Sequence, residues 1–158
     1  MRVFKAPQKI DNNEDNVSLF LAGSIDMGKA INWQTQVTNA LSEYPVDILN
    51  PRRDDWDSSW EQSITNAKFK EQVEWELNAQ HNIADLICFY FDPKGQAPIT
   101  LLELGLFHTQ DIVVCCPEGY FRKGNVDVVC NYFGIEQVES LEDMIEWLKN
   151  RVDNDQYF

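Results

Sequence analysis

The sequence lacks the features that mark membrane, secreted and metal-binding proteins. None of its apolar runs is long enough to cross a membrane, and its first residues contain no apolar stretch that would direct secretion. Its two histidines stand alone, and its four cysteines form no Cys-x-x-Cys pair, so no metal is indicated. We therefore expect a cytoplasmic protein whose cysteines are reduced core residues.

Positive charge is also scarce. The 13 lysine and arginine residues face 26 aspartates and glutamates, which gives a formal net charge of -13. This excess repels nucleic-acid polymers and anionic membranes, although solubility alone explains most of it. A complete glycine-rich phosphate motif is missing, so we expect no cofactor. The expected partners are small molecules, other proteins or further copies of the chain.

The alternation of apolar runs and amphipathic patterns predicts one domain over residues 1–158. No element is predicted in the polar segment 1–16, which has the composition of a turn or mobile segment, and residues 153–158 form a polar tail. We expect an α/β flavodoxin-like, doubly wound domain, whose five-stranded parallel sheet has the order 2-1-3-4-5 and carries helices on both faces. The expected strands are residues 18–22, 46–49, 86–91, 112–116 and 135–138.

This topology predicts a ligand crevice between the first and third strands. Ligands of open α/β sheets bind beyond the carboxyl ends of the strands, where the strand order reverses. The turn after the first strand supplies Gly23, Ser24 and Asp26, and the loop after the third supplies Asp92. We predict that these four residues bind substrate, although Asp92 also fits simple turn chemistry beside Pro93.

Glu103 is the most informative residue, because it stands in the apolar run 97–105 at the start of a predicted helix, just after the buried strand. Two interpretations fit. Thr100 and Glu103 have the spacing of a capping box, in which the glutamate only accepts a backbone N–H. The alternative is a catalytic carboxylate on the floor of the crevice. On the local pattern alone, the capping box is the commoner of the two.

A second carboxylate is selected by helical geometry. Phe69, Val73 and Leu77 are expected to share the buried face of a long helix, and Gln80 follows on the same side. At 100° per residue, Glu76 lies about 60° from the centre of that face and Glu74 about 100°. Glu76 is therefore the predicted partner of Glu103. A boundary glutamate that reaches solvent is the other interpretation.

Five segments together resemble the nucleoside 2-deoxyribosyltransferase family. The resemblance spans about residues 18 to 135, and the glutamate-leucine-glycine element with the first-strand glycine turn is its most specific part. The segments are residues 19–25 (LFLAGSI), 50–53 (NPRR), 72–77 (QVEWEL), 98–105 (PITLLELG) and 124–127 (GNVD).

The resemblance implies a flavodoxin-like enzyme of nucleotide salvage that moves 2-deoxyribose from a 2'-deoxynucleoside to a free nucleobase. Glu103 matches the family's nucleophile, and Glu76 matches a carboxylate near the base, where it would donate the proton that the leaving base needs. Asn125 matches an asparagine lent by a neighbouring subunit. Phe158 resembles an aromatic chain end beside the sugar. The resemblance thus implies a homo-oligomer with shared active sites. Trp75 is expected opposite the apolar face of its helix, where an exposed tryptophan more often marks an oligomer contact than a ligand.

The chain also departs from the family pattern. The tyrosine that orients the nucleophile would fall near Leu19, and a loop carboxylate falls on Ala97, which Asp92 could replace. The spacing from Glu76 to Asp85 is one residue longer than expected, so Glu74 stays an alternative to Glu76.

Two other functions fit the sequence. One is hydrolysis of deoxynucleoside 5'-monophosphates, which the lack of arginine in the first-strand turn disfavours. The other is a non-catalytic nucleoside or nucleotide sensor.

Overall fold

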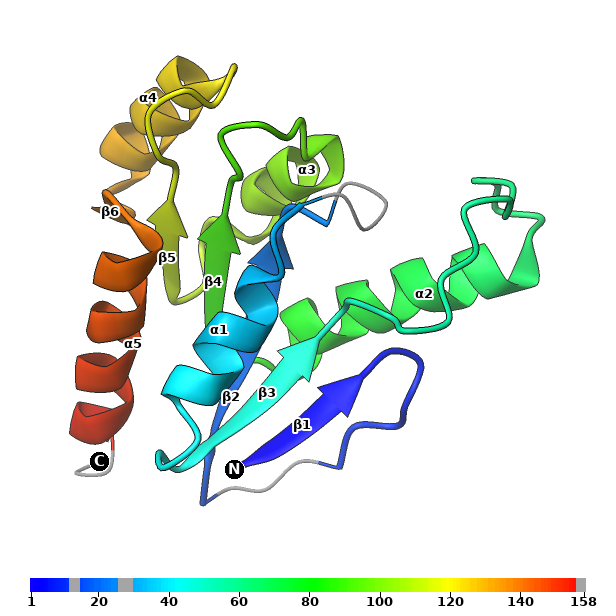
Figure 1. The fold of residues 1–158 in the computed structure, drawn as a ribbon, viewed down its shortest axis with the longest axis horizontal. Coiled ribbons are helices and arrows are strands. Elements are labelled where there is room, and N and C mark those ends of the chain that lie inside the picture. Colours follow the sequence, from blue (N-terminus) through cyan, green and yellow to red (C-terminus); the bar gives the residue numbers. More distant parts are fainter. Residues whose placement is uncertain (12–14, 26–29, 156–158) are drawn as a thin grey trace.

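The computed structural model describes residues 1–11, 15–25 and 30–155, which build a parallel sheet with helices on both faces (Figure 1). The strands are β1 (Arg2–Lys5), β2 (Val17–Gly23), β3 (Val46–Asn50), β4 (Leu86–Tyr90), β5 (Ile112–Cys115) and β6 (Glu136–Val138). The helices are α1 (Trp33–Ala40), α2 (Ala67–Asn78), the π-helical turn η2 (Ala79–Ile83), α3 (Pro98–Phe107), α4 (Lys123–Phe133) and α5 (Leu141–Asp155).

The α/β class and the parallel sheet are confirmed, but the prediction of five strands is wrong. The sheet has six strands in the order β1-β3-β2-β4-β5-β6. The five expected strands keep their expected relative order within it. The additional strand, β1, pairs in parallel with β3 at the edge, in the segment where the sequence predicted no element.

A side-chain pair between residues 45 positions apart joins β1 to β3, in addition to the backbone pairing of the strands and the buried Phe4. The Arg2 side chain donates through Nε to the Asp47 carboxylate at 3.1 Å, and Asn16 donates to the same carboxylate at 2.9 Å. Burial acts to raise the pKa of Asp47, but the hydrogen bonds from Arg2 and Asn16 outweigh it and hold that pKa below its usual range. Local sequence cannot reveal such a contact.

Successive residues of the central strands point into two separate cores, as continuously apolar strands require. Leu19 and Leu21 of β2 pack on α1 and α5, whereas Phe20 and Ala22 pack on the opposite side. That second side is covered by α2, η2, α3 and α4 (Figure 1). All four cysteines are buried and free, as the sequence predicted. No helix within the described residues is long and apolar enough to cross a membrane.

Gly23 lets β2 and β4 approach each other at their carboxyl ends. A Cβ atom at this position would overlap the backbone carbonyl of Tyr90 and would lie 2.7 Å from the indole of Trp33. The chain therefore needs a residue without a side chain here. Immediately afterwards, Ser24 N–H donates to Tyr90 O at 3.0 Å, so the turn starts in register with the end of β4.

Candidate active site

Three of the predicted crevice residues lie together at the carboxyl edge of the sheet. Ser24 is buried directly after Gly23, and its Oγ accepts the backbone N–H of Asp92 at 2.9 Å. This bond joins the turn after β2 to the turn after β4. The indole N–H of Trp33 fixes the same turn by donating to Ser24 O at 3.1 Å. The expected meeting of these two loops is therefore present.

Asp92 has the turn role that the sequence left open. Its Oδ1 accepts the N–H of Lys94 at 2.9 Å, and its carbonyl accepts the N–H of Gly95 at 3.0 Å. Its side chain is buried. The turn role and a substrate contact are compatible, because a carboxylate offers more acceptor positions than one amide fills.

Glu103 does not serve as the predicted helix cap. The cap position of α3 is Ala97, which has a left-handed φ of 45° and makes no side-chain cap bond, and Pro98 begins the helix. Thr100 therefore lies inside the first turn instead of at its cap. Glu103 points into the protein with 7% of its surface exposed, and its Oε1 accepts Nε2 of Gln80 at 2.8 Å. The capping interpretation is wrong.

The buried face of α2 differs from the predicted one. Val73 and Leu77 are 37% and 38% exposed, whereas Gln72 in α2 and the pair Ala79 and Gln80 in η2 are buried. The side of α2 that carries Gln72 and Glu76 is turned inward, whereas Val73 and Leu77 are exposed. Apolar periodicity misled the prediction, because here the buried positions carry glutamines. Glu76, chosen as a boundary residue, lies on the buried side and is half-buried.

Glu76 and Glu103 lie near each other between α2 and α3, and each carboxyl group shifts the pKa of the other. Burial raises the pKa of Glu76 above its ordinary value, and the charge of Glu103 raises it further. Burial also raises the pKa of Glu103, while hydrogen bonds from Gln80 and Glu76 oppose that effect. The pair as a whole therefore keeps a proton to a higher pH than two free glutamates would.

Two buried glutamines flank the pair, and sequence reasoning assigned a role to neither. Gln72 Nε2 donates to Glu76 Oε1 at 2.5 Å and to Pro51 O at 2.9 Å, whereas Gln80 Nε2 donates to Glu103. The spacing of Gln72, Glu76 and Gln80 at every fourth residue was the available signal, since such residues share one helix face.

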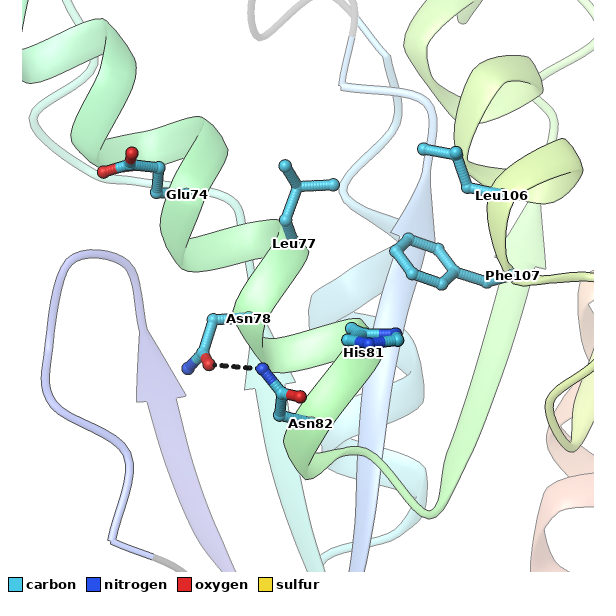
Figure 2. A pocket seen from close by; sticks show the side chains of 7 residues that line it. All are labelled: Glu74, Leu77, Asn78, His81, Asn82, Leu106 and Phe107. Carbon is cyan, nitrogen blue, oxygen red and sulfur yellow. Dashed lines mark hydrogen bonds between the residues drawn. The ribbon is translucent and has the colours of Figure 1, made fainter.

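Glu74, the alternative to Glu76, is directed elsewhere. It is exposed and pairs with Lys70 at 3.5 Å. It lines an open groove of about 470 Å³, in which Leu77 and His81 face Leu106 and Phe107 of α3 (Figure 2). This groove contains neither Glu76 nor Glu103. The geometry therefore favours Glu76 as the partner of Glu103.

Of the remaining predicted site residues, only Asn125 lies within the described residues, and it does not join the carboxyl pair. Asn125 is exposed on α4 and lines a small cavity of about 100 Å³ with residues of α3, including Leu104 and Gly105. Asp26 and Phe158 lie outside the described residues. Among the residues that are described, no three histidine, cysteine, aspartate or glutamate side chains form a cluster that could hold a metal ion.

Comparisons with known proteins identify a family and a similar fold. A family model described as "Nucleoside 2-deoxyribosyltransferase like" matches residues 16–120. The fold is similar to the crystal structure of a conserved protein from Enterococcus faecalis V583, with a TM-score of 0.52 and 14% identity. That similarity covers 86% of this chain and 99% of the other. No curated protein matches the chain.

The raised pKa values predict that the pair destabilises the fold as pH rises. In the unfolded chain both glutamates ionise in their ordinary range, whereas the folded protein retains a proton to higher pH. The stability contribution is therefore complete below the ordinary range and is lost through the raised one. Glu76→Gln removes the titrating carboxyl group at residue 76. The free energy of unfolding of this variant, measured in urea, should therefore fall less between about pH 5 and pH 9 than that of the native chain. Glu74→Gln is the matched control, and identical pH dependence in all three proteins would contradict the buried pair.

Proposed function

The chain belongs to the nucleoside 2-deoxyribosyltransferase-like family, and on this premise we propose that it transfers 2-deoxyribose between nucleobases. The feature that supports the proposal is the buried pair of Glu76 and Glu103, in which both pKa values are raised and Gln80 donates a hydrogen bond to Glu103. In the proposed mechanism Glu76 carries the proton and Glu103 is ionised. Retaining cleavage of a glycosidic bond needs one carboxylate as nucleophile and one carboxylic acid as proton donor. The reaction takes place in nucleotide salvage, with 2'-deoxynucleosides and free nucleobases as substrates.

The first step forms a covalent sugar ester. A carboxylate oxygen of Glu103 attacks the anomeric carbon, and the electron pair of the breaking C–N bond moves to the base. Glu76 gives its proton to a ring nitrogen of the departing base, so the base leaves neutral. The hydrogen bond between the two carboxyl groups opens as the substrate enters between them. The proton that the pair shares in the free protein is thus already beside the leaving group.

The second step reverses the first with another base. A nitrogen of the incoming base attacks the anomeric carbon, the ester bond to Glu103 breaks, and Glu76 accepts the proton that the new bond displaces. Two inversions retain the β configuration. Water in place of the base gives free deoxyribose, so hydrolysis is expected as a side reaction. Gly23, Ser24, Asp26 and Asp92 bind substrate at the crevice.

Hydrolysis of a deoxynucleoside 5'-monophosphate is the second candidate, and the position of Arg52 favours it. The first-strand turn contains no arginine, but Arg52, which follows β3, donates to the carbonyl of Ile31 at 3.4 Å. A guanidinium therefore stands beside the connection between β2 and α1. Guanidinium groups bind phosphate well. Comparison of deoxyinosine with its 5'-monophosphate, with and without free adenine, distinguishes the two activities.

We further propose that two or more copies of the chain associate and share active sites. The exposed face of α3 is apolar at Ile99, Leu102 and Leu106, and the only charged residue of this helix, Glu103, is buried. In a chain with a net charge of -13, an uncharged apolar face fits a second copy of the same chain. Asn125 lies exposed on the adjacent helix α4, where it can reach a neighbouring crevice, and Phe158 is assigned to the same shared site.

Trp75 does not contribute to such an interface in the way that the sequence suggested. Its ring lies 6.3 Å from that of Phe20 against the core, and its indole N–H donates to Gln8 O at 2.8 Å. The oligomer contact is therefore assigned to α3 and α4 instead.

Glu103→Ala should abolish base exchange, because no other group can carry the sugar covalently. We expect a loss of at least about 10³-fold in the formation of deoxyadenosine from deoxyinosine and adenine. Chromatography separates deoxyadenosine from free deoxyribose. Glu74→Ala removes an exposed glutamate from α2 and should retain activity. Near-normal exchange by a folded Glu103→Ala protein would exclude the proposed mechanism.

Glu76→Gln should slow purine transfer by about 10²-fold to 10⁴-fold, because the leaving base loses its proton donor. A substrate whose leaving group departs without a proton should lose far less. The ratio of the two rates in single-turnover measurements separates loss of proton transfer from loss of folding. Equal losses with both substrates would count against a proton-donor role.

Mixed oligomers should test the shared site. Glu103→Ala and Asn125→Ala chains are each expected to be inactive alone, and mixing them should restore part of the exchange through hybrid sites. Sedimentation should show an oligomer for the native chain, and Leu102→Glu should dissociate it by placing charge on the apolar face of α3. A native chain that is monomeric at assay concentration, or mixtures without any recovery, would refute the shared site.

A further inference from the structure

Packing alone does not explain the burial of Gln80. It is fully buried, and its amide N–H donates to Glu103 Oε1 at 2.8 Å and to the carbonyl of Glu76 at 3.4 Å. Among the described residues, its own Oε1 has no hydrogen-bond partner. Burying an unpaired amide oxygen is costly, and an apolar side chain of similar volume would avoid that cost. The N–H contact with Glu103 is what such a replacement would lose.

The backbone around Gln80 is also unusual. η2 is a π-helical turn in which Ala84 N–H donates to Ala79 O at 2.8 Å, and such a turn accommodates one residue more than an α-helical turn. The end of this segment is fixed, because Asp85 accepts the N–H of Ser18 at 2.8 Å and donates to its carbonyl at 2.9 Å. The π-turn therefore fits one residue more than an α-helical turn would between α2 and the fixed Asp85. Gln80 stays four residues beyond Glu76 and faces Glu103.

We propose that Gln80 is a positioning residue, whose amide N–H holds one oxygen of the Glu103 carboxylate so that the group stays oriented for attack on the sugar. This assignment rests on the proposed transfer reaction. Leu19, near which the resemblance places an orienting tyrosine, is fully buried in the opposite core and has no donor to offer. A donor to an ionised carboxylate also favours the charged form over the protonated one. Gln80 thus acts on both the direction and the ionisation of Glu103.

Gln80→Met tests this role, because methionine fills similar volume without the N–H group. We expect kcat for base exchange to fall by about 10-fold to 100-fold with KM changed less, and the acid limb of the pH–rate profile to move to higher pH. Gln34→Met is the matched control, since Gln34 is equally buried on α1 and also has an unpaired amide atom. The control should leave the pH profile in place. A loss of kcat with an unshifted acid limb would overturn the proposal.

A second measurement does not depend on activity. Titration of carboxyl ¹³C signals in protein labelled at glutamate should show a higher pKa for Glu103 in Gln80→Met than in the native chain. Gln80→Asn, whose shorter amide cannot reach Glu103, should give the same shift and replaces the methionine variant if that one does not fold. If the native chain showed no base exchange, the proposed function would be refuted. The titration would still show whether Gln80 lowers the pKa of Glu103. An unchanged pKa of Glu103 in both variants would overturn the role of Gln80.

Discussion

The contact between the buried carboxyl groups of Glu76 and Glu103 is the constraint on which the candidate site depends. Two neighbouring carboxyl groups in a buried place repel each other when both are ionised, and burial disfavours the charge of each. The pair therefore keeps a proton to a higher pH than free glutamates do. In the proposed mechanism this proton serves the leaving base, while the other carboxylate attacks the sugar.

The two carboxyl groups are carried by helices that are fixed at strand ends, not by loops. The missing side chain of Gly23 lets the ends of β2 and β4 meet, and the Ser24 hydroxyl bonds the two turns that follow them. α3 then carries Glu103 directly beyond β4, while α2 presents Glu76 from the other side. The anchor between Asp85 and Ser18 and the π-turn before it set the rotation of α2. Each carboxyl group is consequently placed by a regular element that is fixed at a strand end.

The sequence was sufficient for the features with local causes. Continuous apolar strands gave the parallel sheet, and the turns after β2 and β4, which the topology predicted to meet, are hydrogen-bonded to each other. The prediction failed where distant or polar contacts decide the outcome. β1, in which Arg2 pairs with Asp47, was not predicted. The buried side of α2 and η2 carries Gln72, Glu76 and Gln80, whereas periodicity selected Val73 and Leu77. Glu76 lies on this buried side although the face used to choose it was wrong, and its role as proton donor stays a prediction.

The most direct test of the account is to trap the sugar on the protein. Native chain should be quenched in acid during turnover of a 2'-deoxynucleoside without an acceptor base, and its mass and that of its peptides should be measured. The account predicts the addition of one deoxyribosyl group on the peptide that contains Glu103, and no addition in Glu103→Ala. Turnover that leaves the Glu103 peptide unmodified, or a sugar attached to a different residue, would contradict it.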